Sequence, residues 1–247
     1  MNENIRPRRK KVRIILAAIL LVLVALAGVF FWYVSDYYWA DETSLAVLKE
    51  GQGITRQGNL TILSPEVPSD TAVIFYPGAK VEETAYLPLL DRLRQRGVTC
   101  ILVSMPFHMA IFDVDAAADI IPQFPEVDRW YLAGHSMGGA MASKYAADHP
   151  EQVEGLILLG AYLYGDYPLE RTLTICGTLD GLAAEDIDYT ANVLWLEGGN
   201  HAQFGNYGPQ QGDLPADISA QAQQAQTVEA VSEFLTESAA VTGGEAA

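Results

Sequence analysis

The sequence predicts an α/β fold, with a mostly parallel central sheet flanked by helices and one apolar helix ahead of it. The first observation is that continuous apolar runs, such as TAVIFY at 71–76, alternate with amphipathic segments. Strands that are apolar throughout are covered on both faces, which is typical of parallel sheets. The second is an uncharged segment of 21 residues at 14–34. The third is a serine between two glycines, Ser136, where an apolar run gives way to an amphipathic segment.

The uncharged segment is long enough to cross a membrane. At about 1.5 Å per residue, a helix of this length spans the roughly 30 Å hydrocarbon core. Six of the first 13 residues are basic, which keeps the N-terminus cytoplasmic, and aromatic residues gather at 30–33 and 37–39 as in an interfacial belt. We therefore expect a single-pass membrane anchor, with the rest of the chain outside the cytoplasm. The alternative is secretion after cleavage near Ala27, because Ala25-Leu26-Ala27 has the A-x-A form of a signal-peptide site.

The charge beyond this segment excludes one class of partner. After residue 34 the chain has nine basic and thirty acidic residues, a net charge of −21. A domain this acidic repels phosphate backbones, so we expect no nucleic-acid partner. The two cysteines, Cys100 and Cys176, lie inside apolar runs and show no metal-ligand spacing. We interpret them as small buried side chains and expect no metal or organic cofactor.

The elements follow in order from local signals. Gly58-Asn59 between two short expected strands indicates a β-hairpin. Gly97 ends the helix expected at 83–97, and prolines end the helices expected at 112–125 and 138–150. The further strands are expected at 71–78, 98–106, 129–136, 153–163, 171–180 and 192–199, and the further helices at 43–49, 183–191 and 219–237.

These elements divide the chain into five parts. The expected parts are a cytoplasmic basic segment (1–13), a transmembrane helix (14–34), a juxtamembrane connector (35–53), an α/β domain (54–237) and a flexible tail (238–247). The tail consists mainly of small residues, which bury too little apolar surface to fix a structure.

The stretch GHSMG at 134–138 has the form G-x-S-x-G and lies between an expected strand and an expected helix. Glycines on either side permit a tight corner that lifts the hydroxyl of Ser136 above the sheet. The helix that begins there points free backbone N–H groups at the serine. This context predicts a nucleophilic serine; the alternative is an ordinary glycine turn with an unreactive one.

Two further reactive side chains follow strand ends, where ligands bind in parallel sheets. Asp180 stands at the end of the strand segment expected at 171–180, where a carboxylate can orient a histidine. The alternative is that Asp180 belongs to a turn or caps a helix. His201 comes after the last strand on a glycine-rich loop and is the expected general base. The competing histidine is His108, which either lines the pocket or packs. The order Ser, Asp, His along the chain matches that of α/β-hydrolase sheets.

An oxyanion formed at Ser136 needs two backbone N–H donors. We expect the first at Met137, directly after the serine. The second is expected in the loop YPGAKVE, at Ala79, with Gly78 as the second choice. The alternative is that this loop has no such role.

The substrate pocket is expected to be shallow. Only about seven residues separate the strands expected to end near 163 and begin near 171, which leaves no room for a helical lid. An open pocket suits small or exposed acyl groups. The residues expected to contact substrate are Tyr76, His108, Phe204, Asn206 and Tyr207.

Taken together, FYPGAKVE, GHSMGG, CGTLD and GGNHAQFGNYG make the chain from about 54 to 237 resemble the α/β-hydrolase superfamily. Within it, the chain is similar to the small, lid-less, dienelactone-hydrolase-like group. The resemblance implies a Ser136–His201–Asp180 triad and an acyl-serine intermediate. Dienelactone hydrolases proper use a cysteine nucleophile, so Ser136 separates this chain from them and leaves their substrate open here.

The sequence therefore predicts a membrane-anchored serine hydrolase that cleaves an ester or related acyl bond outside the cytoplasm. Its expected partners are a small acyl or ester substrate and, through the N-terminal helix, the membrane. Two alternatives remain open at this point. The same triad could transfer the acyl group to an acceptor other than water, or the fold could be a catalytically silent scaffold that binds a ligand or partner at the cell surface.

Overall fold

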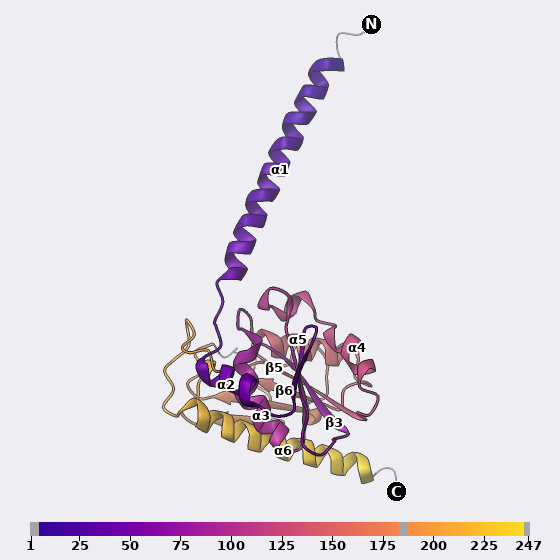
Figure 1. Cartoon of the computed structure of the whole chain (residues 1–247), viewed down its shortest axis with the longest axis vertical. Helices are drawn as coiled ribbons and strands as arrows, with labels where there is room; N and C mark the ends of the chain where they lie inside the picture. Colours follow the sequence, from indigo (N-terminus) through magenta and orange to yellow (C-terminus); the bar gives the residue numbers. More distant parts are fainter. Residues whose placement is uncertain (1–4, 183–186, 245–247) are drawn as a thin grey trace. The chain divides into compact units, whose positions relative to one another are not determined.

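The computed structural model describes residues 5–182 and 187–244, with side chains described for 10–182 and 187–238. It divides the chain into two units, Met1–Tyr37 and Tyr38–Ala247 (Figure 1). The first unit contains helix α1, Ile5–Ser35, in which Lys10–Ser35 is long and apolar enough to cross a membrane. A signal sequence near the N-terminus meets the same criteria of length and composition. The helix is therefore a candidate membrane span.

In its described residues, the second unit is built on one eight-stranded sheet with the strand order β1-β2-β4-β3-β5-β6-β7-β8. The strands are β1 Ile54–Gln57, β2 Leu60–Leu63, β3 Thr71–Tyr76, β4 Thr99–Val103, β5 Arg129–His135, β6 Gly155–Leu159, β7 Thr172–Gly177 and β8 Val193–Leu196. The hairpin β1–β2 is antiparallel, as is the pairing of β2 with β4, and the other pairings are parallel. The predicted α/β-hydrolase fold class is confirmed.

Helices cover both faces of this sheet (Figure 1). The helices α2 Glu42–Glu50, α3 Leu87–Gln95 and α6 Ala220–Gly244 pack on one face, and α4 Ala116–Ile120 and α5 Met137–Asp148 pack on the other. Successive side chains of a strand point to opposite faces, so a strand buried on both sides needs no polar alternation. In β3, for example, Val73 and Phe75 enter the first core cluster, while Ile74 enters the second.

The connector before the sheet belongs to the folded unit, which begins at Tyr38 and not at residue 54. Asp41 caps α2 by accepting a hydrogen bond from the Ser44 N–H at 3.0 Å. Val47 and Leu48 of this helix pack against the core cluster that contains α3. Apolar contacts of this kind stabilise a helix that is too short to persist alone.

Three predicted helices differ from the structure. The segment 112–125 contains only the short α4 between 3-10 turns, because Pro122 and Pro125 interrupt a regular helix. Of the helix expected at 183–191, residues 183–186 lie outside the described residues, and 187–191 form no helix. Helix α6 continues to Gly244, seven residues beyond its predicted end. No glycine or proline stops the helix before Gly243, and alanine favours its continuation.

Candidate active site

Ser136 occupies the corner between β5 and α5 in a strained backbone conformation, with φ 52° and ψ −124°. Residues other than glycine rarely adopt a positive φ, and such backbone strain persists only where the surrounding structure holds it. Here the Ser136 N–H donates to the Leu159 carbonyl at 3.0 Å. A Cβ added to Gly138 would lie 2.1 Å from the Tyr76 carbonyl oxygen, and one added to Gly134 would lie 2.4 Å from the Gly138 carbonyl carbon. Both glycines of the motif therefore permit the close approach that forms the corner.

Asp180 and His201 form a buried pair. Asp180 follows β7 and His201 follows β8, so parallel pairing of these strands brings the two loops to one edge of the sheet. His201 Nδ1 lies 2.9 Å from Asp180 Oδ2 and 3.1 Å from Oδ1. The exposed fractions of the two side chains are 2% and 0%. A carboxylate only accepts hydrogen bonds, so the proton of this hydrogen bond belongs to His201 Nδ1.

Ser136 and His201 line the same pocket, which has a volume of about 270 Å³. Because Nδ1 of His201 carries the proton, Nε2 has the lone pair. This Nε2 is buried and has no hydrogen-bond partner among the described residues. No hydrogen bond joins it to Ser136 Oγ in that part of the chain. The pocket is thus lined by the Ser136 hydroxyl and by an imidazole whose Nε2 is unpaired, while its Nδ1 hydrogen-bonds the Asp180 carboxylate.

The backbone N–H groups of Met137 and Ala79 donate no hydrogen bond among the described residues. The Tyr76 and Pro77 carbonyls pack directly against Gly138, so the loop that carries Ala79 adjoins the corner. The N–H of Gly78, the second choice, already donates to the Tyr86 hydroxyl at 3.1 Å. Of the two loop positions, Ala79 is therefore the one with an unused donor.

A buried chain of hydrogen bonds runs from this loop to His201. Beyond Gly78, the Tyr86 hydroxyl lies 2.8 Å from His135 Nδ1, and His135 Nε2 lies 3.1 Å from the His201 carbonyl oxygen. That carbonyl only accepts, so His135 Nε2 carries a proton. Complete burial and the nearby His201 lower the pKa of His135 well below its ordinary value, so Nδ1 is unprotonated and accepts from Tyr86. Every donor in this chain then meets an acceptor.

None of the residues expected to contact substrate lines the pocket beside Ser136. The Tyr76 hydroxyl is engaged elsewhere, donating to the Val114 carbonyl at 3.0 Å and accepting from the Ala117 N–H at 2.9 Å. The loop after His201 folds back into the core, so Phe204, Asn206 and Tyr207 are buried there. Asn206 accepts from Gln224 Nε2 at 2.7 Å. His108 is half-buried, and its carbonyl accepts from the Lys80 N–H.

The residues that do line the pocket were not recognisable as a group. Besides Ser136, Met137 and His201, they are Ile111, Ala140, Met141, Gly160, Ala161, Tyr162 and Leu182. They come from four separate segments, so no local pattern joins them. Gly160 alone had a signal, because it ends the apolar run GLILLG at the carboxyl edge of the sheet. It has φ 51°, and a Cβ there would lie 2.9 Å from His201 Nδ1.

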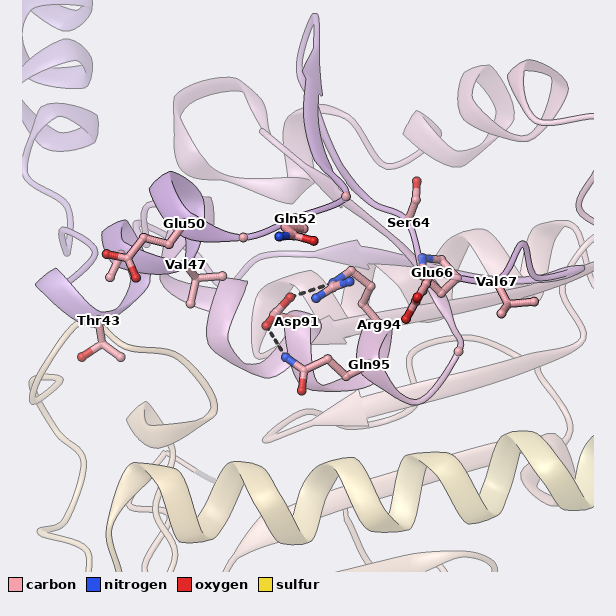
Figure 2. Close-up of a pocket in the computed structure, with 15 residues that line it drawn as sticks. Thr43, Val47, Glu50, Gln52, Ser64, Glu66, Val67, Asp91, Arg94 and Gln95 are labelled. Carbon is pink, nitrogen blue, oxygen red and sulfur yellow. Dashed lines mark hydrogen bonds and ion pairs between the residues drawn. The ribbon is translucent and has the colours of Figure 1, made fainter.

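A second cavity lies at the opposite edge of the sheet (Figure 2). It has a volume of about 1040 Å³ and is lined by α2, by the segments flanking the β1–β2 hairpin and by the end of α3. Gly97 lines it just before β4 begins, whereas Ser136 follows the carboxyl end of β5. In Figure 2, Asp91 bonds Arg94 Nε at 2.7 Å and Gln95 Nε2 at 2.6 Å. Asp91, Arg94 and Gln95 are thus committed to one another, and the described residues that line this cavity include no histidine or cysteine.

Both cysteines are buried free thiols. Burial raises the pKa of Cys176 to about 12 and that of Cys100 further still. A thiol with such a pKa forms almost no thiolate near neutral pH and is a poor nucleophile. Neither cysteine therefore competes with Ser136.

The family model for the alpha/beta hydrolase family matches residues 72–225. The chain belongs to this family. A protein of Mycobacterium phage D29 described as a non-heme haloperoxidase is 30% identical over 104 residues, a match covering 38% of this chain and 37% of that protein's length. This alpha/beta hydrolase thus matches little more than a third of the length of that curated relative.

Among solved structures, Est1E from Butyrivibrio proteoclasticus superposes with a TM-score of 0.55 at 17% identity, covering 76% of this hydrolase and 98% of Est1E. A dienelactone hydrolase from Anabaena variabilis superposes with a TM-score of 0.50 at 15% identity, covering 72% and 90%. At these identities the likeness shows the fold, which agrees with the sheet order described above.

Proposed function

We propose that this alpha/beta hydrolase is a serine esterase that cleaves an ester or related acyl bond through an acyl-Ser136 intermediate. The observation that carries the proposal is the shared pocket, which is lined both by Ser136 in its strained corner and by His201, whose Nε2 is unpaired among the described residues. The family match supports hydrolase chemistry, and the geometry supports the serine route within it.

In the proposed mechanism, His201 Nε2 takes the Ser136 proton as Oγ attacks the acyl carbonyl. The N–H groups of Met137 and Ala79 donate to the oxyanion that forms. Asp180 stabilises the imidazolium and holds it in place. The imidazolium then protonates the leaving alcohol, and the tetrahedral intermediate collapses to the acyl-serine. Water attacks this ester with His201 again as base, which releases the acid and restores the Ser136 hydroxyl.

The pocket favours a small uncharged acyl group. Its described walls are mainly apolar, with Ile111, Met141 and Leu182 among them, and they carry no carboxylate, ammonium or guanidinium group. Pockets for small ligands usually measure about 300 to 1,000 Å³, so a volume of about 270 Å³ lies at the small end. The segment 160–171 between β6 and β7 holds only a 3-10 turn at its end, so no helical lid enlarges the site there.

We further propose that α1 anchors the enzyme in a membrane, with the N-terminus cytoplasmic and the hydrolase unit outside the cytoplasm. The candidate span at Lys10–Ser35 and the basic residues ahead of it support this topology. N-terminal sequencing of the membrane-bound protein distinguishes the anchor from a cleaved signal peptide. An intact residue 1 supports the anchor, and a new N-terminus near residue 28 supports secretion.

The test of the activity is labelling of the full-length protein, purified in detergent, with a fluorophosphonate probe. We expect the probe on Ser136 by peptide mapping and no label in Ser136→Ala. A folded wild-type protein that does not react would contradict the serine route and favour a silent binding scaffold. If the label appears, product analysis with water and added alcohols separates hydrolysis from acyl transfer.

A further inference from the structure

Asp213 is an acidic residue in the long loop after His201 to which the proposed mechanism gives no role. Its carboxylate nevertheless accepts hydrogen bonds from four backbone N–H groups. Oδ1 accepts from Gly181 at 3.1 Å, from His201 at 3.2 Å and from Leu214 at 3.0 Å. Oδ2 accepts from Ala202 at 2.9 Å. Hydrogen bonds to an ionised acceptor are roughly twice as strong as neutral ones.

The donors belong to both loops that carry the Asp180–His201 pair. Gly181 directly follows Asp180 in the first loop. In the second loop the donors are His201 itself and its neighbour Ala202. One side chain therefore joins the backbone beside the carboxylate to the backbone of the histidine. The pairing distance of 2.9 Å between His201 Nδ1 and Asp180 Oδ2 depends on how these two loops lie against each other.

We propose that Asp213 is a positioning residue that fixes the Asp180–His201 pair by binding both loops at once. The proposal rests on the proposed serine mechanism, in which that pair is the general base and its orienting group. Asp213 touches neither the pocket beside Ser136 nor the imidazole of His201, so it acts through the backbone of the two loops.

The side chain must be a carboxylate for this task. All four partners are donors, and a carboxylate has only acceptors. An asparagine of the same shape would direct its NH₂ at one set of N–H groups, whichever way it turned. That face would lose its hydrogen bonds and set an NH₂ group against backbone N–H donors.

Asp213→Asn is the test variant, and Asp217→Asn is its matched control. Asp217 lies in the same loop, is exposed, and its carboxylate accepts no hydrogen bond among the described residues. Both substitutions remove one negative charge, so the comparison isolates the loss of hydrogen bonds. The experiment uses the full-length protein in detergent.

Two signals are measured: the rate of fluorophosphonate labelling of Ser136, and the downfield proton resonance of the Asp180–His201 hydrogen bond. We expect Asp213→Asn to slow labelling at least tenfold and to weaken or shift the resonance. Asp217→Asn should label within twofold of the wild type and keep the resonance. A role confined to loop stability would lower the melting temperature but leave the resonance of the folded protein in place.

Labelling and resonance unchanged in folded Asp213→Asn would overturn the proposal. If this variant does not fold, amide hydrogen exchange in the wild type decides, because the N–H groups of Gly181, His201 and Ala202 must exchange slowly. Fast exchange at all three overturns the proposal. One further outcome separates the two proposals. If the wild type shows the resonance but does not label, and Asp213→Asn loses the resonance, the serine mechanism is contradicted while the role of Asp213 is supported.

Discussion

The corner that carries Ser136 and the loops that carry Asp180 and His201 are held in place in different ways. The corner is fixed by tight backbone packing, because a Cβ at Gly134 would meet the backbone of Gly138 and a Cβ at Gly138 would meet the Tyr76 carbonyl at the end of β3. The loops are fixed by hydrogen bonds between residues far apart in the chain, such as the Asp213 bonds to Gly181 and His201. Close backbone packing fixes the nucleophile, and hydrogen bonds to a side chain fix the loops of its base.

If this contrast is right, the largest effect on folding comes from the corner. Gly138→Ala places a methyl group 2.1 Å from a backbone oxygen that cannot move aside without shifting β3. We expect a loss of about 3 kcal/mol or more in the free energy of unfolding, or no folded protein. Urea unfolding measures it.

Gly97→Ala is the control for this substitution. Gly97 has φ 89°, but a Cβ there meets nothing within 4 Å. The cost should be the backbone strain alone, about 1 to 2 kcal/mol. Equal losses for the two variants would mean that the corner is not limited by space.

The largest effect on catalysis without loss of folding should come from Asp180→Asn. The amide keeps the shape but favours the wrong tautomer of His201, with the proton on Nε2. We expect the rate of probe labelling to fall by about 10⁴-fold, as kcat does in Ser-His-Asp enzymes. Circular dichroism checks the fold, and labelling within tenfold of the wild type would show that Asp180 is not the orienting group.

A smaller effect should follow from Tyr86→Phe, which cuts the hydrogen-bond chain between Gly78 and His135. The loss leaves a buried N–H and a buried imidazole nitrogen unpaired, at about 1 to 3 kcal/mol. We expect labelling to slow about tenfold, because the loop of Ala79 loosens.

Tyr145→Phe is the matched control. It also removes a hydroxyl from a buried tyrosine, which donates to Gln152 at 2.8 Å on the outer part of α5. It should lower stability with little change in labelling. Similar labelling rates for the two variants would limit Tyr86 to a structural role.

The smallest effect concerns pH. The pKa of His135 is lower in the folded than in the unfolded chain, because burial and the nearby His201 oppose its charge. Below about pH 6.5, the unfolded chain therefore binds a proton at His135 that the folded chain does not bind. The contribution of neutral His135 to the free energy of unfolding is complete above that pH and is lost as the pH falls. The loss is at most about 1.4 kcal/mol per pH unit.

Thermal unfolding between pH 7 and pH 5 measures this dependence. His135→Asn should flatten the fall in melting temperature relative to the wild type. His149→Gln, at the end of α5, is the control and should leave the slope in place. An unchanged slope in His135→Asn would show that another group titrates in this range.

The sequence by itself determined the fold class, the strand that precedes Ser136 and the helix that follows it. These depend on local patterns: continuous apolar runs, and glycines spaced as a tight corner requires. The positions of Asp180 and His201 after strands also followed from local order, and both lie in one buried pair. Their catalytic roles stay a prediction until the labelling experiment is done.

Only the tertiary structure decided which side chains surround Ser136. Phe204, Asn206 and Tyr207 were expected at the substrate because they follow His201, yet their loop packs into the core against α3 and α6. Ile111, Met141 and Leu182 line the pocket, although each looks like an ordinary apolar residue in the sequence. Asp213 likewise looks like one acid among thirty-one. Local sequence sets backbone geometry within a few residues, but only the packing of distant segments sets which side chains and N–H groups meet.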